Sequence, residues 1–160
     1  MFLYGKNSVT ERLKLKPESI IKIFLEDNFD DVYIEKLIKE KRIPLERINS
    51  QKLYRIKKAD NLQGVIAKVG DFTYTAFDDF LLAKDRHLTL IFLDRVYDPQ
   101  NLGAIIRTAA CFGGFALIIP KHKACEVNET ALHVAQGAEN HIPIAMVSNQ
   151  IGRASCRERV

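Results

Sequence analysis

Apolar runs alternate with amphipathic stretches through the first 70 residues. The isoleucine-rich run Ser19–Glu26 predicts a buried strand, and Gly64–Val69 predicts another. Ser8 and Glu11 have the spacing of a helix capping box, which predicts a short helix running toward Lys14. The first part of the chain is therefore predicted to contain a short helix, then one strand, and a second strand near its end.

Two more helices are predicted between these strands. In the stretch 30–43, three apolar residues fall near one helical face: Val32, Leu37 and Ile38. In the stretch 47–58, a short helix is expected to begin at Asn49 or Ser50, both of which are good N-cap residues. Alternating strands and helices with short links indicate a small α/β unit.

A second α/β pattern follows residues 71–87, where the chain turns from lysine-rich to acidic and aromatic. We expect a linker there that includes a short helix, Phe77–Ala83. Three buried strands are then predicted: Leu88–Asp94, Phe115–Pro120 and His141–Asn149. The continuous apolar run of the first favours a strand covered on both faces in a parallel sheet. A helix capped by Asn128 is expected before the third.

The final residues 151–160, IGRASCRERV, follow a predicted strand directly and show neither a helical nor a strand period. We expect this segment to be foreign to the native protein, which would then continue past Asn149.

Charge is divided unevenly along the chain. Residues 1–70 contain 15 Lys and Arg against 10 Asp and Glu, whereas residues 71–150 contain 6 against 9. The basic surplus of the first part could meet a polyanion such as nucleic acid. A lysine-rich solvated surface explains the charge equally well.

The cysteines and the hydropathy of the chain exclude several classes of protein. The three cysteines, Cys111, Cys125 and Cys156, have no metal-ligand spacing, and their odd number argues against a disulfide framework. We expect Cys111 and Cys125 to be small buried residues rather than nucleophiles. No apolar run is long enough to cross a bilayer, and the N-terminus lacks a secretion signal. These features predict a cytoplasmic protein without a membrane or metal partner.

The stretch Asp98–Gly113 carries the candidate chemistry. It follows a predicted parallel strand, where ligands bind in open α/β sheets. Asn101 is suited to cap the next helix, and Gly103 in its first turn would let a substrate or another backbone approach closely. Gly103 and Arg107 are four residues apart and so share a helical face. A cation near a helix N-terminus suits a phosphate or a developing oxyanion.

Each of these residues also has a structural explanation. Asn101 can be a simple cap, Gly103 can accommodate packing, and Arg107 can be an ion-paired or surface cation. No G-x-G-x-x-G dinucleotide fingerprint is present, which disfavours a Rossmann-like enzyme acting on a small molecule.

Taken whole, LDRVYDPQNLGAIIRTAACFGGFALIIP resembles the first conserved motif of the SpoU-type RNA ribose 2′-O-methyltransferases, in the SPOUT (trefoil-knotted) superfamily. The matching positions are Leu93, Asp94, Asp98, Pro99, Asn101, Leu102, Gly103, Arg107, Thr108, Ala109 and Gly113. The stretches YGKNSVTERLK and LQGVIA resemble the L30e-like domain that precedes the knotted domain in the branch acting on ribosomal RNA.

The resemblance implies an α/β architecture of two domains. Residues 1–70 would be an L30e-like substrate-binding domain, residues 71–87 a linker with a short helix, and residues 88–149 an incomplete SPOUT parallel-sheet domain. The family's later motifs, which form the cofactor pocket and much of the dimer interface, are not found after Asn149. The resemblance therefore implies a homodimer for the full-length protein, and little or no activity for the 160 residues alone.

The family transfers a methyl group from S-adenosyl-L-methionine to a ribose 2′-hydroxyl of folded RNA. For this protein the resemblance implies a guanosine of ribosomal RNA as the expected substrate, with tRNA as the alternative. Carried onto this sequence, the catalytic residues are Arg107 and Asn101. A guanidinium with a pKa above about 12 is a reluctant base. We therefore expect Arg107 to hold the target phosphate and stabilise the alkoxide, and Asn101 to orient the loop or the hydroxyl.

In the first domain, four polar residues are candidate contacts to the RNA backbone: Lys6, Asn7, Arg12 and Gln63. Gly103 is added as a position where RNA could approach the second domain. No residue is assigned to the cofactor or to a metal. The competing hypothesis is a non-catalytic RNA-binding module, which an L30e-like domain could be by itself.

Overall fold

The computed structural model describes residues 1–59, 61–82 and 88–148. The chain divides into two compact units, one of residues Met1–Asp71 and one that begins at Phe72. Each unit has its own sheet and its own buried core. None of the helices in the described segments is long and apolar enough to cross a membrane.

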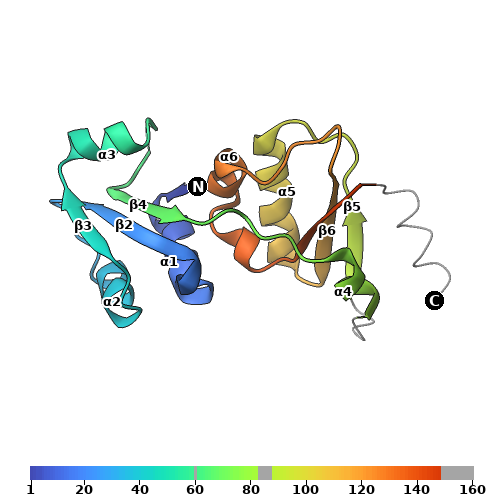
Figure 1. Ribbon diagram of the computed structural model, residues 1–160, viewed down its shortest axis with the longest axis horizontal. Helices are drawn as coiled ribbons and strands as arrows, with labels where there is room; N and C mark the ends of the chain where they lie inside the picture. The colour runs from blue at the N-terminus through green and yellow to red at the C-terminus, as the bar shows by residue number, and fades with distance from the viewer. Residues whose placement is uncertain (60, 83–87, 149–160) are drawn as a thin grey trace. The chain divides into compact units, whose positions relative to one another are not determined.

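The first unit is built on a four-stranded sheet in the order β1-β4-β2-β3 (Figure 1). Its strands are β1 (Phe2–Tyr4), β2 (Ile20–Glu26), β3 (Leu45–Ile48) and β4 (Val65–Val69). β2 and β3 run parallel, and the other two pairings are antiparallel. The strands predicted at 19–26 and 64–69 are confirmed. The two edge strands were not predicted, because β1 has three residues and β3 is exposed at its first three positions.

Helices cover both faces of this sheet, with α3 (Ser50–Ile56) on one side and α1 (Lys6–Leu15) and α2 (Val32–Glu40) on the other (Figure 1). Under α3, Leu53 packs with Ile48 and Ile66. The predicted start of α3 is confirmed, because Asn49 caps it by accepting a hydrogen bond from the backbone N–H of Lys52 at 2.9 Å.

Two local predictions in this unit were wrong. Helix α1 begins at Lys6, and Ser8 lies inside it with a buried side chain, so the Ser8–Glu11 pair is not a capping box. In α2, the prediction is confirmed for Ile38, which is buried with Ile34, and Leu37 is half-buried, but it was wrong for Val32, which is 79% exposed. Asp31 caps α2, so Val32 is its first residue and lies beyond the edge of the core-facing stripe.

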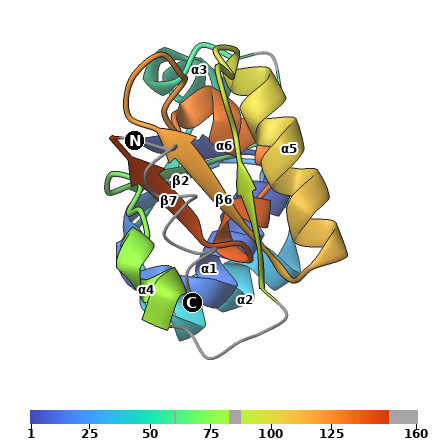
Figure 2. The same ribbon diagram turned by 90° about the vertical axis from the view of Figure 1, so that its right-hand side faces the viewer.

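The second unit contains three parallel strands in the order β5-β6-β7, shown side by side in Figure 2. They are β5 (Thr89–Phe92), β6 (Phe115–Pro120) and β7 (Ile144–Val147). The central strand β6 is buried along most of its length. β5 is an edge strand, and its side chains are half-buried or exposed, so the prediction that it is covered on both faces was wrong.

Helices lie on both sides of this sheet, with α5 (Pro99–Phe112) on one side and α4 (Phe77–Leu82) on the other (Figure 2). Phe77 of α4 packs against Ile118, Ala145 and Val147. Helix α6 (Glu129–Ala135) packs along α5, and the predicted cap Asn128 is confirmed by its 3.0 Å hydrogen bond from the backbone N–H of Ala131.

The segment expected to be a linker is tied to the second unit where the structure describes it. The hydroxyl of Tyr74 accepts a hydrogen bond from the N–H of Val127 at 3.0 Å, and the N–H of Thr75 donates to the carbonyl of Ile144 at 2.8 Å. Helix α4 begins at Phe77 as predicted, and Ala83 lies outside the described residues, as does the whole C-terminal segment 149–160.

Candidate functional site

The loop between β5 and α5 lies where the sequence places the candidate chemistry. Asp98, not Asn101, caps α5: its Oδ1 accepts a hydrogen bond from the N–H of Gln100 at 2.8 Å, and Pro99 occupies the first helical position. Asn101 is the third residue of the helix and is exposed. The predicted capping role of Asn101 was therefore wrong, which leaves its side chain available for another partner.

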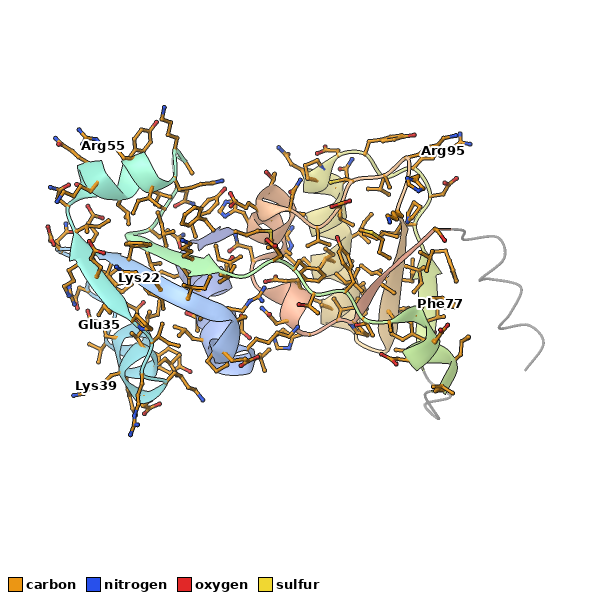
Figure 3. The ribbon with its side chains drawn as sticks, in the orientation of Figure 1. Lys22, Glu35, Lys39, Arg55, Phe77 and Arg95 are labelled. Carbon is orange, nitrogen blue, oxygen red and sulfur yellow. The ribbon has the colours of Figure 1, made fainter. Side chains whose placement is uncertain are left out.

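A hollow of about 560 Å³ opens beside this loop and the first turns of α5. Its walls are Arg95, Val96, Tyr97, Asp98, Asn101, Ala104 and Ile105. Arg95 has a left-handed backbone with φ of 55°, a conformation that is uncommon outside glycine and asparagine. Its guanidinium lies 3.8 Å from the carboxylate of Asp94, and both side chains are highly exposed. Figure 3 labels Arg95 at the outer edge of the second unit.

Arg107 does not line this hollow. It lies on the face of α5 that packs on α6, and its Nη1 donates a 3.3 Å hydrogen bond to the backbone carbonyl of Val134. The side chain is exposed. Among the described residues, the guanidinium of Arg107 is therefore not directed into the hollow at the N-terminus of α5. Arg107 and Asn101 are six positions apart, so a regular helix turns them to different faces.

Gly103 shares the face of Arg107, as the spacing predicted, but it is buried in the second turn of the helix. A Cβ atom at this position would lie 2.5 Å from the backbone oxygen of Ala131 and 2.7 Å from the Cβ of Val134. The close approach at Gly103 is therefore made by helix α6. Because Gly103 is buried, its position gives no support to the predicted contact between Gly103 and RNA.

In the first unit, the structure brings Lys6 and Gln63 together. Oε1 of Gln63 accepts a 2.7 Å hydrogen bond from the backbone N–H of Lys6, the first residue of α1. The ammonium of Lys6 lies 3.1 Å from Oδ2 of Asp31 and 5.1 Å from the ring centroid of Phe29. Asn7 is exposed beside Lys6. Three of the four predicted RNA contacts therefore cluster at the N-terminus of α1.

Arg12 does not belong to that cluster. Its side chain is 6% exposed, and Nη1 donates a 3.4 Å hydrogen bond to Oγ of Ser19. A buried guanidinium that ties α1 to the start of β2 has a structural role, so the prediction of an RNA contact at Arg12 is withdrawn.

Two further polar features were missed by the sequence analysis. Arg95 and Tyr97 line the hollow beside Asn101, yet neither has a spacing that a local pattern could single out. Asp31 caps α2 through its 3.2 Å hydrogen bond from the N–H of Ile34. That bond, and next the bond from Lys6, lowers the pKa of Asp31 below its usual 3.8. An acidic residue just before the helix was the available signal for this cap.

Two protein-family models match the chain, one in its first part and one in its second. Residues 88–154 match the model of the SpoU rRNA Methylase family, and residues 2–75 match the model described as RNA 2′-O ribose methyltransferase substrate binding. The chain belongs to the SpoU family. The first match extends to residue 154, so it includes the beginning of the segment that we expected to be foreign.

Members of the SpoU family align with nearly the whole chain. The 23S rRNA (guanosine-2′-O-)-methyltransferase RlmB of Haemophilus influenzae is 34% identical, over 92% of this chain and 62% of that protein. An AdoMet-bound rRNA methyltransferase from Sinorhizobium meliloti has a TM-score of 0.77 at 23% identity, over 98% of this chain and 57% of its own. AviRb of Streptomyces viridochromogenes, solved with AdoMet, has a TM-score of 0.78 at 17% identity, over 99% and 58%. The chain thus spans about three fifths of each relative.

A second hollow, between α5 and β5, does not suit the cofactor of the SpoU family. It has a volume of about 340 Å³ and is lined by Ile91, Ala104, Ile105, Thr108, Ala109, Phe112 and Phe115. Its one polar side chain is the hydroxyl of Thr108. A ligand with ribose hydroxyls, an amino group and a carboxylate needs several placed polar partners. The residues of this hollow therefore do not hold the cofactor by themselves.

The His, Cys, Asp and Glu side chains of the described residues decide whether the chain could hold a metal ion or present a reactive thiol. Among the described residues, no three His, Cys, Asp or Glu side chains come together in a way that could hold a metal ion. Cys111 is exposed, so the expectation that it is buried was wrong, and Cys125 is half-buried. Burial, and then the nearby carboxylates of Asp98 and Glu126, raises the pKa of the Cys125 thiol.

Proposed function

We propose that the whole protein, of which these 160 residues are a part, methylates a ribose 2′-hydroxyl of ribosomal RNA, with a guanosine as the target nucleoside and S-adenosyl-L-methionine as the methyl donor. The observation that carries the proposal is the pair of family matches, because a methylase model and a substrate-binding model of the same enzyme family follow one another along the chain. The guanosine follows from the RlmB relatives, which are named as 23S rRNA (guanosine-2′-O-)-methyltransferases.

Charge supports RNA binding by the first unit. Residues 1–70 carry a net excess of five positive charges, from 15 Lys and Arg against 10 Asp and Glu. The exposed polar cluster of Lys6, Asn7 and Gln63 gives this unit a place to contact phosphates. Affinity for RNA is then expected to fall steeply with salt, because each phosphate contact releases a condensed counterion.

Arg107 and Asn101 are proposed to act on the target nucleotide from two different faces of α5. The bond from Arg107 to Val134 uses one of the five N–H donors of an exposed guanidinium, so the others can bind a phosphate in the planar fork that lysine lacks. Asn101 faces the hollow of Arg95 and Tyr97, where its amide can orient a hydroxyl. These roles predict that Arg107→Lys in the whole enzyme retains charge but loses most of its turnover.

The 160 residues by themselves are proposed to transfer little or no methyl, because the family's later motifs, which the resemblance assigns to the cofactor pocket, are not found after Asn149, and the hollow between α5 and β5 has one polar side chain. Homodimerisation of the whole protein belongs to the same proposal. Isothermal calorimetry with S-adenosyl-L-methionine checks the first point, and light scattering of the whole protein checks the second. Measured cofactor binding by the 160-residue chain would overturn the proposed inactivity.

The decisive experiment for the reaction is to map ribose methylation in RNA from cells that lack the full-length gene. Loss of one 2′-O-methylguanosine from ribosomal RNA, restored by the wild-type gene and not by Arg107→Lys, is the expected result. Loss from a tRNA instead would favour the alternative substrate. Unchanged methylation of both RNAs would leave a non-catalytic RNA-binding module as the better description.

A further inference from the structure

A hollow of about 420 Å³ opens in the first unit between helix α3 and the turn at Gln63 and Gly64. It is lined by Glu26, Ser50, Leu53, Tyr54, Ala59, Leu62, Gln63 and Gly64. Its volume falls within the roughly 300–1,000 Å³ typical of small-ligand sites. All of these residues belong to the first unit, whereas the residues of the Asn101 hollow belong to the second.

The walls of this hollow combine an aromatic ring with apolar and polar groups. Tyr54 is 49% exposed, although the residue before it, Leu53, is buried in the core at 2%. Leu62 is half-buried at the same place and packs against the core that contains Leu53. An open aromatic side chain beside an apolar floor offers a planar ligand one face to stack on and a surface to cover.

Hydrogen-bonding groups lie at the edge of the hollow. The carboxylate of Glu26 can accept N–H donors, and among the described residues none donates a hydrogen bond to it. The amide oxygen of Gln63 is engaged by Lys6, which fixes the side chain and leaves its NH₂ group as a donor. A planar ligand with both donors and acceptors at its rim matches this set, and a nucleobase is such a ligand.

Positive charge surrounds the same helix. Between Asn49 and Ala59 the chain has four cations, Lys52, Arg55, Lys57 and Lys58, and no acidic residue. Figure 3 shows Arg55 extending outward from α3 into solvent. Nζ of Lys57 lies 5.6 Å from the ring centroid of Tyr4, a neighbour of the hollow's core. This one-signed charge complements a polyanion and would repel a basic protein segment.

We propose that the hollow beside α3 binds one unpaired nucleotide of the RNA substrate, with its base stacked on Tyr54 and its flanking phosphates held by the cations of α3. The site would read a single-stranded loop or bulge, because an unpaired base can stack on a protein ring without the cost of first breaking its pairing and stacking in a helix. The inference rests on the proposed function to the extent that it requires the first unit to bind RNA.

The test measures binding of the full 160-residue chain to a labelled single-stranded RNA of about 12 nucleotides, and to the same RNA as a duplex, by fluorescence anisotropy. Tyr54→Ala is expected to weaken single-strand binding about 5- to 150-fold and to leave duplex binding unchanged, since base stacking is worth roughly 1–3 kcal/mol. Tyr54→Phe, which retains the ring, is expected to bind like the wild type. Tyr33→Ala is the matched control, because Tyr33 is 52% exposed on α2, away from the hollow.

The cations are tested by salt dependence. Arg55→Ala is expected to reduce the slope of log K against log salt by about one, whereas Lys39→Ala, an exposed cation on α2, is expected to leave the slope unchanged. Photo-cross-linking with 5-iodouridine at an unpaired position is expected to attach RNA to Tyr54. Circular dichroism confirms that each variant is folded.

The outcomes separate the two proposals. If the wild-type chain binds neither RNA at low salt, both RNA binding by the first unit and this subsite fail. If the wild type binds RNA and Tyr54→Ala binds the single strand equally well, the subsite alone is overturned. Equal loss in Tyr54→Ala and Tyr33→Ala would also overturn it, because the effect would then not be specific to the hollow.

Discussion

Gln63 caps helix α1 from a distant part of the chain. Its Oε1 accepts a hydrogen bond at 2.7 Å from the backbone N–H of Lys6, 57 residues earlier in the sequence. The residue at the N-cap position, Gly5, has no side chain to do this. Because the first N–H groups of a helix have no partner within it, a side chain from another segment can satisfy one of them. Gln63 therefore joins the start of α1 to the turn before β4.

This contact predicts separable effects of two substitutions. Gln63→Ala is expected to lower the free energy of unfolding by about 0.5–2 kcal/mol, the usual loss on removing a helix cap. Gln63→Glu keeps the acceptor and adds a negative charge near the helix N-terminus, so stability is expected to be retained. RNA affinity is expected to fall in both if the side chain contacts phosphate.

Urea denaturation and RNA titration measure the two effects. Asn61→Ala serves as the control, since Asn61 is an exposed neighbour of the same turn. Unaltered stability of Gln63→Ala would show that the bond to Lys6 contributes little.

Gly103→Ala tests the packing of α5 on α6. Alanine normally favours a helix by about 1 kcal/mol over glycine. Here the added Cβ would lie 2.5 Å from the carbonyl oxygen of Ala131, so the helices must separate. We expect a net loss of about 1–3 kcal/mol in urea denaturation. Gly70→Ala is the matched control, because a Cβ there meets nothing within 4 Å; an equally destabilised Gly70→Ala would contradict the explanation.

Asp31 predicts a pH-dependent contribution to stability. Its pKa is lowered in the folded chain, first by the hydrogen bond from Ile34 and then by Lys6. A lowered folded pKa means that the stabilisation is present above the unfolded pKa of about 3.9 and is lost as pH falls through the folded pKa. Asp31→Ala is expected to cost about 1 kcal/mol at neutral pH. The difference from the wild type should shrink below pH 3.8.

Denaturation at pH 7 and at about pH 3 measures this change. The exposed neighbour Asp30 supplies the control Asp30→Ala, which should differ little from the wild type at either pH. A destabilisation of Asp31→Ala that is the same at both pH values would rule out ionisation as its cause.

The two described thiols are expected to react at different rates. Cys111 is exposed, whereas Cys125 is half-buried and has a raised pKa, so less of its thiolate is present near neutral pH. Iodoacetamide at pH 7.5 should alkylate Cys111 first, as followed by peptide mapping. The difference should narrow at higher pH as Cys125 ionises. Faster labelling of Cys125 would contradict its surroundings in the structure.

Much of the fold follows from local patterns. The apolar runs at 19–26, 64–69 and 115–120 form strands because a strand's side-chain alternation and β-branched content are properties of neighbouring residues. Asn49 and Asn128 cap their helices for the same reason, since a cap bonds an N–H three residues away. The motif around Arg107 was sufficient to indicate the SpoU family, which the family match then showed.

The placement of side chains within the site did not follow from these patterns. The sequence put Gly103 and Arg107 on one helical face, but only the packing of α6 decided that this face is covered. It marked Lys6, Arg12 and Gln63 alike as polar, yet Arg12 is buried against Ser19 and Gln63 caps α1. Periodicity depends on residues within a turn of each other, whereas these contacts join positions tens of residues apart, which only the folded chain brings together.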